Sequence, residues 1–366
     1  MLTDLTPPVA SFASDNYAGA HPSVLDAVAE ANVGHVAAYG ADPWTERCER
    51  LFADLFGRPV EVALTFGGTG ANVVALHTLC SRDSSVICTS DAHIALDEAG
   101  APEHITGAQL VCYPWNAVGK LTPEHVHDAA ARFGRVHIDD VTATKHVVSV
   151  TQPTEVGTVY TPDELAAICE AAHRYQMAVH VDGARLANAF VAWGYGAARL
   201  GDACRRLLEC GVDVVSFGGT KAGLLGAEAV VFADPASAGP VAQRRKQATQ
   251  TASKMRFLAA QMLVALESGA ILDWAGAANA AARRLADGIA TVPGVAPGYP
   301  VETNAVFVTM PRGAITALEA WTHFYVWDPA RDLVRFVTAW DTTEQDVASL
   351  AAGVRVACAA SPVGGS

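Results

Sequence analysis

The alternation of strand and helix patterns between residues 60 and 233 constrains the fold of this chain most strongly. Short runs rich in β-branched residues, typical of buried strands, alternate with longer amphipathic runs that predict helices. The strands are expected at 60–66, 85–89, 109–113, 146–150, 178–181, 212–217 and 227–233. This order indicates an α/β fold, in which a mostly parallel sheet is covered by helices on both faces.

The pattern changes after residue 233. Helical segments are expected at 241–269 and 274–289, strands at 304–310 and 333–340, and a last helix capped near Thr342. This half of the chain therefore predicts a second, smaller α+β unit. We expect three regions, which are an N-terminal segment, a large α/β domain and a small C-terminal α+β domain, at 1–20, 21–269 and 270–366.

Composition excludes several classes of protein. Of the 366 residues, 51% are hydrophobic and 17% are charged, as in compact globular proteins, and no apolar run has transmembrane length. The net charge of −13 argues against nucleic acid or an anionic membrane as a partner. The N-terminus has no signal-peptide pattern, and the eight cysteines form no Cys-x-x-Cys pair. We expect a cytoplasmic protein with reduced thiols and no metal site.

Three polar residues follow the ends of predicted strands, where α/β sheets bind their ligands. They are His93, Asp182 and Lys221. Lys221 lies among small residues, and a desolvated lysine can attack a carbonyl group to form a Schiff base. Each residue also has an ordinary alternative: Lys221 could be a solvated hairpin lysine, Asp182 a helix cap and His93 a hydrogen-bonded loop residue.

A glycine-rich segment, Gly-Gly-Thr-Gly-Ala-Asn at 67–72, joins the first strand to a helix expected at 73–80. Backbone N–H groups at such a helix start can bind a phosphate, and glycines let the anion approach. The segment matches neither the dinucleotide nor the P-loop pattern, and glycine-rich turns also have purely structural uses.

Motifs along nearly the whole chain resemble those of the low-specificity L-threonine aldolases, which are fold-type I pyridoxal 5′-phosphate (PLP) enzymes. In chain order they are FASDNYAGAHP, AYGADPW, FGGTGANVVAL, SDAHIALDEAGAPE, TQPTEVGTVYTPDEL, VHVDGARLANA, SFGGTKAGLLGAEAVVF, ASKMRFLAAQ and VRFVTAWDT. The resemblance implies a fold-type I, transferase-like large domain with a smaller α+β domain. It implies reversible cleavage of L-threonine, L-allo-threonine or a phenylserine-type substrate to glycine and an aldehyde.

The resemblance also implies roles for the strand-end residues. Lys221 would hold PLP as a Schiff base, and Asp182 would keep the pyridine nitrogen protonated so that the ring accepts electrons. His93 would stack on the ring and assist proton transfer. The cofactor phosphate would be held by Gly68, Thr69 and Gly70.

Further positions match residues that bind substrate or cofactor. Ser14, Arg185 and Arg335 would bind the substrate carboxylate, with Ser14 in an N-terminal segment near the active site. Tyr39 and Arg256 match positions that reach the substrate and the cofactor from a neighbouring subunit, which implies a homotetramer of close dimers. The alternatives are a surface ion pair for Arg185, a solvent-facing position for Arg335, and ordinary packing or surface positions for the last two.

One departure from the family concerns the base that removes the β-hydroxyl proton. Many relatives carry a histidine over the active site, where this chain has Gln152, Pro153 and Thr154, with Thr154 at the histidine position. His93 and an ordered water are the remaining candidates for the base. A PLP-dependent β-eliminating lyase is the nearest rival function, and a non-covalent nucleotide-binding protein is a more distant one.

Overall fold

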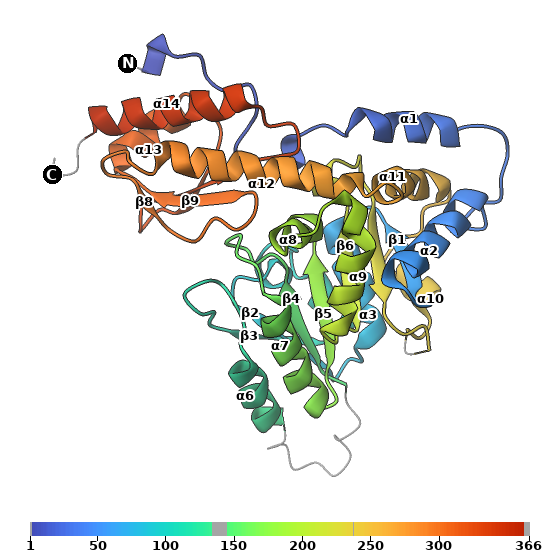
Figure 1. Ribbon diagram of the computed structural model, residues 1–366. Helices are drawn as coiled ribbons and strands as arrows, with labels where there is room; N and C mark the ends of the chain where they lie inside the picture. The colour runs from blue at the N-terminus through green and yellow to red at the C-terminus, as the bar shows by residue number, and fades with distance from the viewer. Residues whose placement is uncertain (1, 134–144, 237, 362–366) are drawn as a thin grey trace.

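The computed structural model describes residues 2–133, 145–236 and 238–361, and its main feature is a seven-stranded sheet (Figure 1). The strand order is β1-β7-β6-β5-β4-β2-β3, and only β7 runs against its neighbours. The strands are β1 (Glu61–Thr65), β2 (Ser85–Thr89), β3 (Gln109–Tyr113), β4 (Val147–Thr151), β5 (Ala178–Gly183), β6 (Val214–Gly218) and β7 (Glu228–Phe232). The expected mostly parallel sheet is confirmed.

Helices cover both faces of this sheet. Neighbouring residues of a strand point to opposite faces, and in β6 the buried Val214 belongs to a core beneath α3 whereas Val215 belongs to the larger core beneath α2, α7 and α9. The helices of this part are α1 (Pro22–Ala31), α2 (Pro43–Phe56), α3 (Gly68–Leu79), α4 (His93–Leu96), α5 (Ala101–Thr106), α6 (Pro123–Phe133), α7 (Pro162–Arg174), α8 (Leu186–Ala192), α9 (Leu200–Glu209), α10 (Val241–Gln247) and α11 (Arg256–Leu266).

Two helix predictions were wrong in their limits. Helix α3 begins at Gly68 instead of residue 73, because Gly67 has an extended backbone (φ −163°) and the glycines after it already form the first turn. The helical segment expected at 241–269 is two helices, α10 and α11, and the chain between them includes Thr249 in a left-handed conformation (φ 60°). Helices α8 and α9 were not predicted.

The C-terminal part contains a four-stranded antiparallel sheet in the order β10-β11-β9-β8. Its own buried core includes Leu285, Phe336 and Leu350. The elements are α12 (Ala270–Ile289), β8 (Ala296–Pro297), β9 (Ala305–Thr309), α13 (Arg312–Glu319), β10 (Tyr325–Asp328), β11 (Leu333–Val337) and α14 (Glu344–Ala360). The expected α+β C-terminal region is therefore confirmed. Helix α12 contacts both α8 and α14, and the division into domains at residue 270 stays a prediction.

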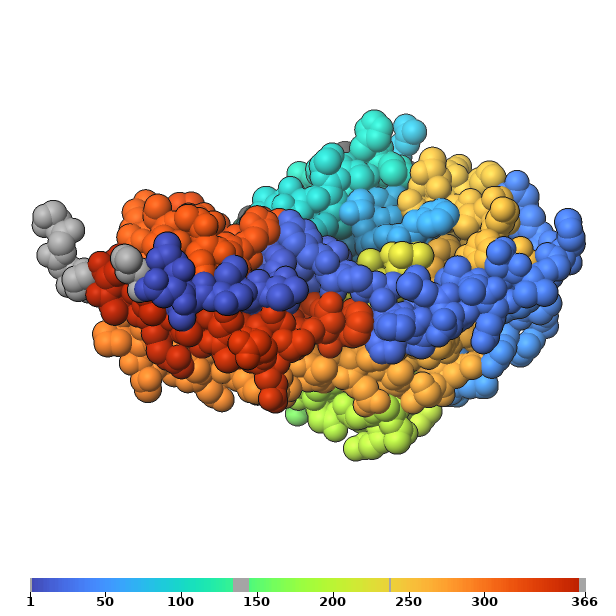
Figure 2. Space-filling view, turned by 90° about the horizontal axis from the view of Figure 1, so that it is seen from above, coloured from blue at the N-terminus to red at the C-terminus, as the bar shows by residue number. Residues whose placement is uncertain are grey.

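The N-terminal segment is tied to the small sheet. The Phe12 N–H donates to the His323 carbonyl, and the Phe12 carbonyl accepts from the Val337 N–H at 2.8 Å. Figure 2 shows this segment, in dark blue, lying along the C-terminal elements in orange and red. The segment begins with a short 3-10 turn, η1 (Leu2–Asp4), and ends with another, η2 (Asp15–Tyr17). Because Phe12 is bonded to the small sheet, η2 lies directly after this attachment.

Among the described residues, no single helix is both long and apolar enough to cross a membrane. Helices α11 and α12 reach that length and apolar character only when counted together, and they are bent by 69° with respect to each other.

Candidate active site

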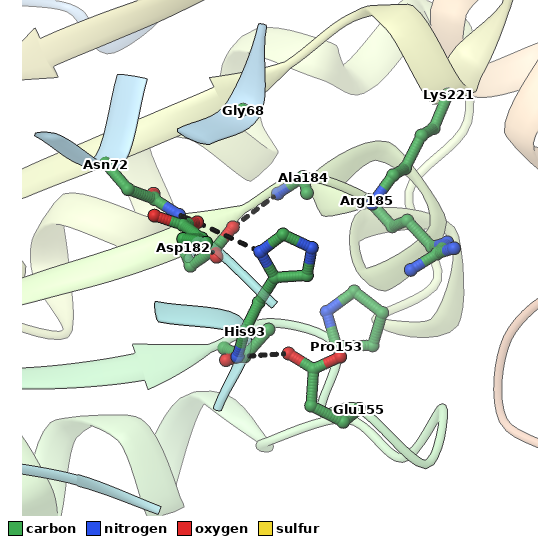
Figure 3. A pocket seen from close by; sticks show the side chains of 11 residues that line it. Gly68, Asn72, His93, Pro153, Glu155, Asp182, Ala184, Arg185 and Lys221 are labelled. Carbon is green, nitrogen blue, oxygen red and sulfur yellow. Dashed lines mark hydrogen bonds and ion pairs between the residues drawn. The ribbon is translucent and has the colours of Figure 1, made fainter. Parts of the chain in front are cut away.

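A pocket opens where the parallel strands of the large sheet end (Figure 3). Residues that follow β1, β2, β4, β5 and β6 all reach it, because the carboxyl ends of parallel strands share one edge of the sheet. The lining consists of Gly68, Asn72, His93, Glu98, Thr151, Pro153, Glu155, Asp182, Ala184, Arg185 and Lys221. The three polar strand-end residues of the sequence analysis therefore lie in one pocket.

Lys221 lies on a short 3-10 turn, Thr220–Ala222, two residues after β6. The turn ends at Gly223, which adopts φ 107°, a conformation that favours glycine. The positive charge of Arg185 lowers the pKa of Lys221, and burial lowers it further. A larger fraction of this amine is consequently neutral, as a nucleophilic lysine requires.

Asp182 is a buried carboxylate in β5, with 4% of its surface exposed. Its Oδ2 accepts a hydrogen bond from Asn72 Nδ2 at 2.8 Å, and its Oδ1 accepts one from the Ala184 N–H at 3.1 Å. Both carboxylate oxygens are thus held by donors, which fixes the group in its place at the pocket wall.

His93 is the first residue of α4, and its imidazole points into the middle of the pocket in Figure 3. Its Nδ1 lies 2.9 Å from Glu98 Oε1, which also accepts from Asn72 Nδ2 at 2.8 Å. The hydrogen bond to Glu98 raises the pKa of His93. One asparagine side chain therefore connects the aspartate of β5 to the glutamate that orients the histidine.

The glycines fit an anion site. Gly68, Thr69 and Gly70 form the first turn of α3, where amide N–H groups have no partners within the helix. No atom lies within 4 Å of the position that a Cβ would take on Gly68, so the backbone there is open to a ligand. Gly70 is covered by the side chain of Gln250, whose Oε1 accepts from the Phe66 N–H.

Of the three residues expected to bind the substrate carboxylate, Arg185 lines the pocket, and Ser14 and Arg335 are not among the lining residues. The Arg185 guanidinium is paired with Asp15. Arg185 Nε and Nη2 donate to the two carboxylate oxygens of Asp15 at 2.6 and 2.8 Å. Arg335, on β11, donates to the Ala13 carbonyl and lies against the ring of Trp327, and burial lowers its pKa to about 10. The Ser14 hydroxyl caps η2 by accepting from the Asn16 N–H.

Tyr39 and Arg256 lie outside this pocket. The Tyr39 side chain is 59% exposed, and Lys246 Nζ lies 5.3 Å from the centre of its ring. Arg256, the first residue of α11, donates to the carbonyls of Val33 and Gly34 at 3.4 Å. A single chain does not bring these two residues to the other candidates.

Thr154 also turns away from the pocket. It is buried, and its Oγ1 pairs with Thr158 Oγ1 at 2.7 Å. The neighbouring Glu155 lines the pocket instead. Glu155, Asn72 and Glu98 are pocket residues that the sequence analysis did not select, although Glu155 follows a predicted strand just as His93 does.

Among the residues that the structure describes, no group of three or more histidine, cysteine, aspartate and glutamate side chains is arranged to hold a metal ion.

Comparisons with known proteins point to one family of enzymes and to a fold shared more widely. The family model described as beta-eliminating lyase matches residues 11–312. The low-specificity L-threonine aldolase of Pseudomonas aeruginosa is 43% identical over 94% of this chain and 97% of its own length. A threonine aldolase of Leishmania major superposes with a TM-score of 0.86 at 27% identity, covering 96% of this chain and 99% of that chain. A structure of a serine palmitoyltransferase (SPT) with PLP is 17% identical and superposes with a TM-score of 0.69 over 95% of this chain and 87% of that chain. This likeness shows a shared fold.

Proposed function

The chain belongs to the beta-eliminating lyase family, and from that premise we propose that it is a PLP-dependent threonine aldolase. It cleaves L-threonine, L-allo-threonine and related β-hydroxy-α-amino acids to glycine and an aldehyde. The observation that carries this proposal is the meeting of Lys221, Asp182 and the first turn of α3 in one pocket.

The residues of the pocket fit PLP in charge and position. The first-turn amides of α3, at Gly68, Thr69 and Gly70, suit its phosphate, and the buried carboxylate of Asp182 suits its protonated ring nitrogen. When bound, PLP supplies a carbonyl carbon for an amine and a ring that accepts an electron pair. Lys221 is the amine that would hold it, and the His93 imidazole, which lies in the same pocket, would stack on its ring.

The protein side chains then orient the amino acid. Arg185 lines the pocket, and Arg335 lies close enough for its charge to act on Asp15 and Glu155. With the hydroxyl of Ser14, the two arginines would bind the substrate carboxylate. Asp15, which is itself buried, accepts from the partly buried Arg185 guanidinium and keeps this cation paired before the substrate arrives.

We propose a homotetramer of close dimers, in which Tyr39 and Arg256 reach the substrate and the cofactor of a neighbouring subunit. The support is a set of large apolar side chains that one chain leaves exposed near α1 and the start of α3. They are Leu25, Val33, Val36, Phe66 and Leu225. We also propose that the chain is divided into three regions, at 1–20, 21–269 and 270–366. A cytoplasmic location is proposed as well, because the cysteines are unpaired and thiols stay reduced in that compartment.

Replacement of Lys221 tests the proposal. Lys221→Ala should abolish the visible absorbance of the Schiff base and lower cleavage of L-threonine by at least about 10³-fold, because the amine acts as a covalent nucleophile. Lys145→Ala, which changes an exposed lysine, should leave both unchanged. Products are measured by chromatography: a 2-oxo acid with ammonia, in place of glycine with acetaldehyde, would identify β-elimination and refute the aldolase reaction.

A further inference from the structure

The loop after β4 places an acid in the pocket where the sequence predicted none. Thr154 is fixed by Thr158 on the protein side of this loop, through both its hydroxyl and its backbone N–H. The next side chain, Glu155, therefore points the other way and lines the pocket with Lys221 and Asp182.

The Glu155 carboxylate is held at one oxygen and open at the other. Its Oε1 accepts a hydrogen bond from the His93 backbone N–H at 3.1 Å. No hydrogen bond joins its Oε2 to another described residue. Its charged and titratable neighbours are Asp182, Lys221, His93, Arg185 and Arg335. Burial, followed by the negative charge of Asp182, raises the pKa of Glu155. A carboxyl group in this setting is closer to the pKa that suits proton transfer near neutral pH.

The other two acids of the pocket, Asp182 and Glu98, are held by hydrogen bonds within the protein. Asp182 uses both oxygens, one for Asn72 and one for the Ala184 N–H. The Glu98 side chain is fully buried, and its Oε1 is shared between Asn72 and the His93 Nδ1. Its Oε2 has no hydrogen-bond partner, but burial shuts it off from a substrate. Among the described acids of the pocket, Glu155 is thus the one whose unpartnered oxygen is not shut off from the pocket, so this oxygen can meet a substrate.

We propose that Glu155 is the catalytic base that removes the β-hydroxyl proton of the substrate, a role that rests on the proposed aldolase function. The Glu155 carboxylate takes the hydroxyl proton, and the O–H electron pair forms the C=O bond of the aldehyde. The Cα–Cβ bond breaks and leaves its electron pair on Cα, where bound PLP would supply the acceptor for that charge. After the aldehyde leaves, Glu155 returns its proton to water, and Cα takes a proton from water, so hydrogen moves overall from oxygen to Cα.

The variant Glu155→Gln isolates this role, because glutamine keeps an oxygen for the His93 N–H and loses the basic oxygen. We expect its kcat for L-threonine cleavage to fall by about 10²–10⁴-fold, as for removal of a general base. The acidic limb of the pH–kcat profile should disappear as well. Glu155→Asp keeps a carboxylate and should recover part of the rate.

Glu302 offers the matched control for a purely structural role in this loop. Glu302 Oε2 accepts from the Val159 N–H and so supports the same loop from outside the pocket. Glu302→Gln should leave the pH–kcat profile unchanged. If Glu302→Gln lost as much cleavage activity as Glu155→Gln, and both variants kept the acidic limb of the profile, Glu155 would only shape the loop. That result would overturn the proposal.

Exchange of the glycine α-proton with D₂O, followed by NMR, separates this proposal from the proposed function. Glycine has no β-hydroxyl, so exchange should persist in Glu155→Gln while threonine cleavage is lost. Cleavage by this variant within about threefold of the unchanged protein would overturn the assignment of Glu155. An unchanged protein that shows neither exchange nor aldehyde release would instead overturn the aldolase function itself.

Discussion

At the scale of single residues, Glu228 is a second buried acid close to Lys221. It begins β7 with 5% of its surface exposed, and its Oε2 accepts from the Gly219 N–H at 2.7 Å, just before the turn that carries the lysine. Burial raises its pKa from the ordinary 4.5 to about 7. The structure therefore keeps an acid with a near-neutral pKa under the turn of Lys221.

This raised pKa predicts how stability depends on pH. Between pH 4.5 and about 7 the folded protein binds a proton at Glu228 that the unfolded chain has lost, so the free energy of unfolding falls as pH rises. Glu228→Gln has no proton to lose, so its free energy of unfolding should not show this decrease. The free energy of unfolding of the variant minus that of the unchanged protein should therefore be about 1–3 kcal/mol larger at pH 8 than at pH 5. Urea unfolding without cofactor at the two pH values measures the difference. The exposed Glu170→Gln should show none, and an equal pH dependence in Glu228→Gln and the unchanged protein would contradict the prediction.

Some pocket residues could be predicted from the sequence and others could not, and the difference has a physical reason. Lys221, Asp182 and His93 could be selected because each lies at or shortly after the end of a predicted strand, which is a local signal. Asn72 acts through contacts with Glu98 and Asp182, which are 26 and 110 positions away in the chain. Such contacts arise only when the sheet brings α3 and β5 together, and no spacing within the sequence encodes them.

At the scale of elements, the ends of β5 and β6 are packed with almost no space between them. A Cβ on Gly218, the last residue of β6, would lie 2.4 Å from the Ala184 carbonyl oxygen. These two strand ends carry Asp182 and lead to Lys221. Their separation thus depends on a glycine at position 218.

Gly218→Ala should therefore push the two strand ends apart and lower the free energy of unfolding by about 1–3 kcal/mol, since backbone atoms cannot move aside as a side chain can. Gly226→Ala is the matched control on the same hairpin, because the nearest atom to its Cβ would be 3.8 Å away. We expect that control to stay within about 0.5 kcal/mol of the unchanged protein in urea unfolding. Equal stability of the two variants would contradict the close approach of β5 and β6.

Predictions of elements were accurate where a pattern has sharp ends. The strands expected at 85–89 and 109–113 have those limits in the structure, because each apolar run stops at a turn-forming residue, Ser90 after the first and Pro114 after the second. Helix α3 starts at glycines, which have low helix propensity, so its first turn was predicted as a loop. The break between α10 and α11 depends on the backbone conformation at Thr249, which the polar, helix-compatible sequence there does not indicate.

At the scale of the whole molecule, the positions of Tyr39 and Arg256 bear on assembly. Both lie outside the pocket of their own chain, Tyr39 exposed and Arg256 bonded to carbonyls at the end of α1. Under the proposed assembly they complete the pocket of a neighbouring subunit. Each pocket would then need Lys221 from one chain and Arg256 from the other.

Mixing two inactive variants tests this sharing of residues. Lys221→Ala and Arg256→Ala proteins, unfolded together and refolded, form hybrid dimers in which one of the two pockets combines an intact Lys221 with an intact Arg256. Because half of the randomly paired dimers are hybrids, the mixture should regain about a quarter of the native rate of threonine cleavage. Each variant refolded alone serves as the control and should stay inactive. A mixture that remains as inactive as its components would show that Arg256 serves only its own chain.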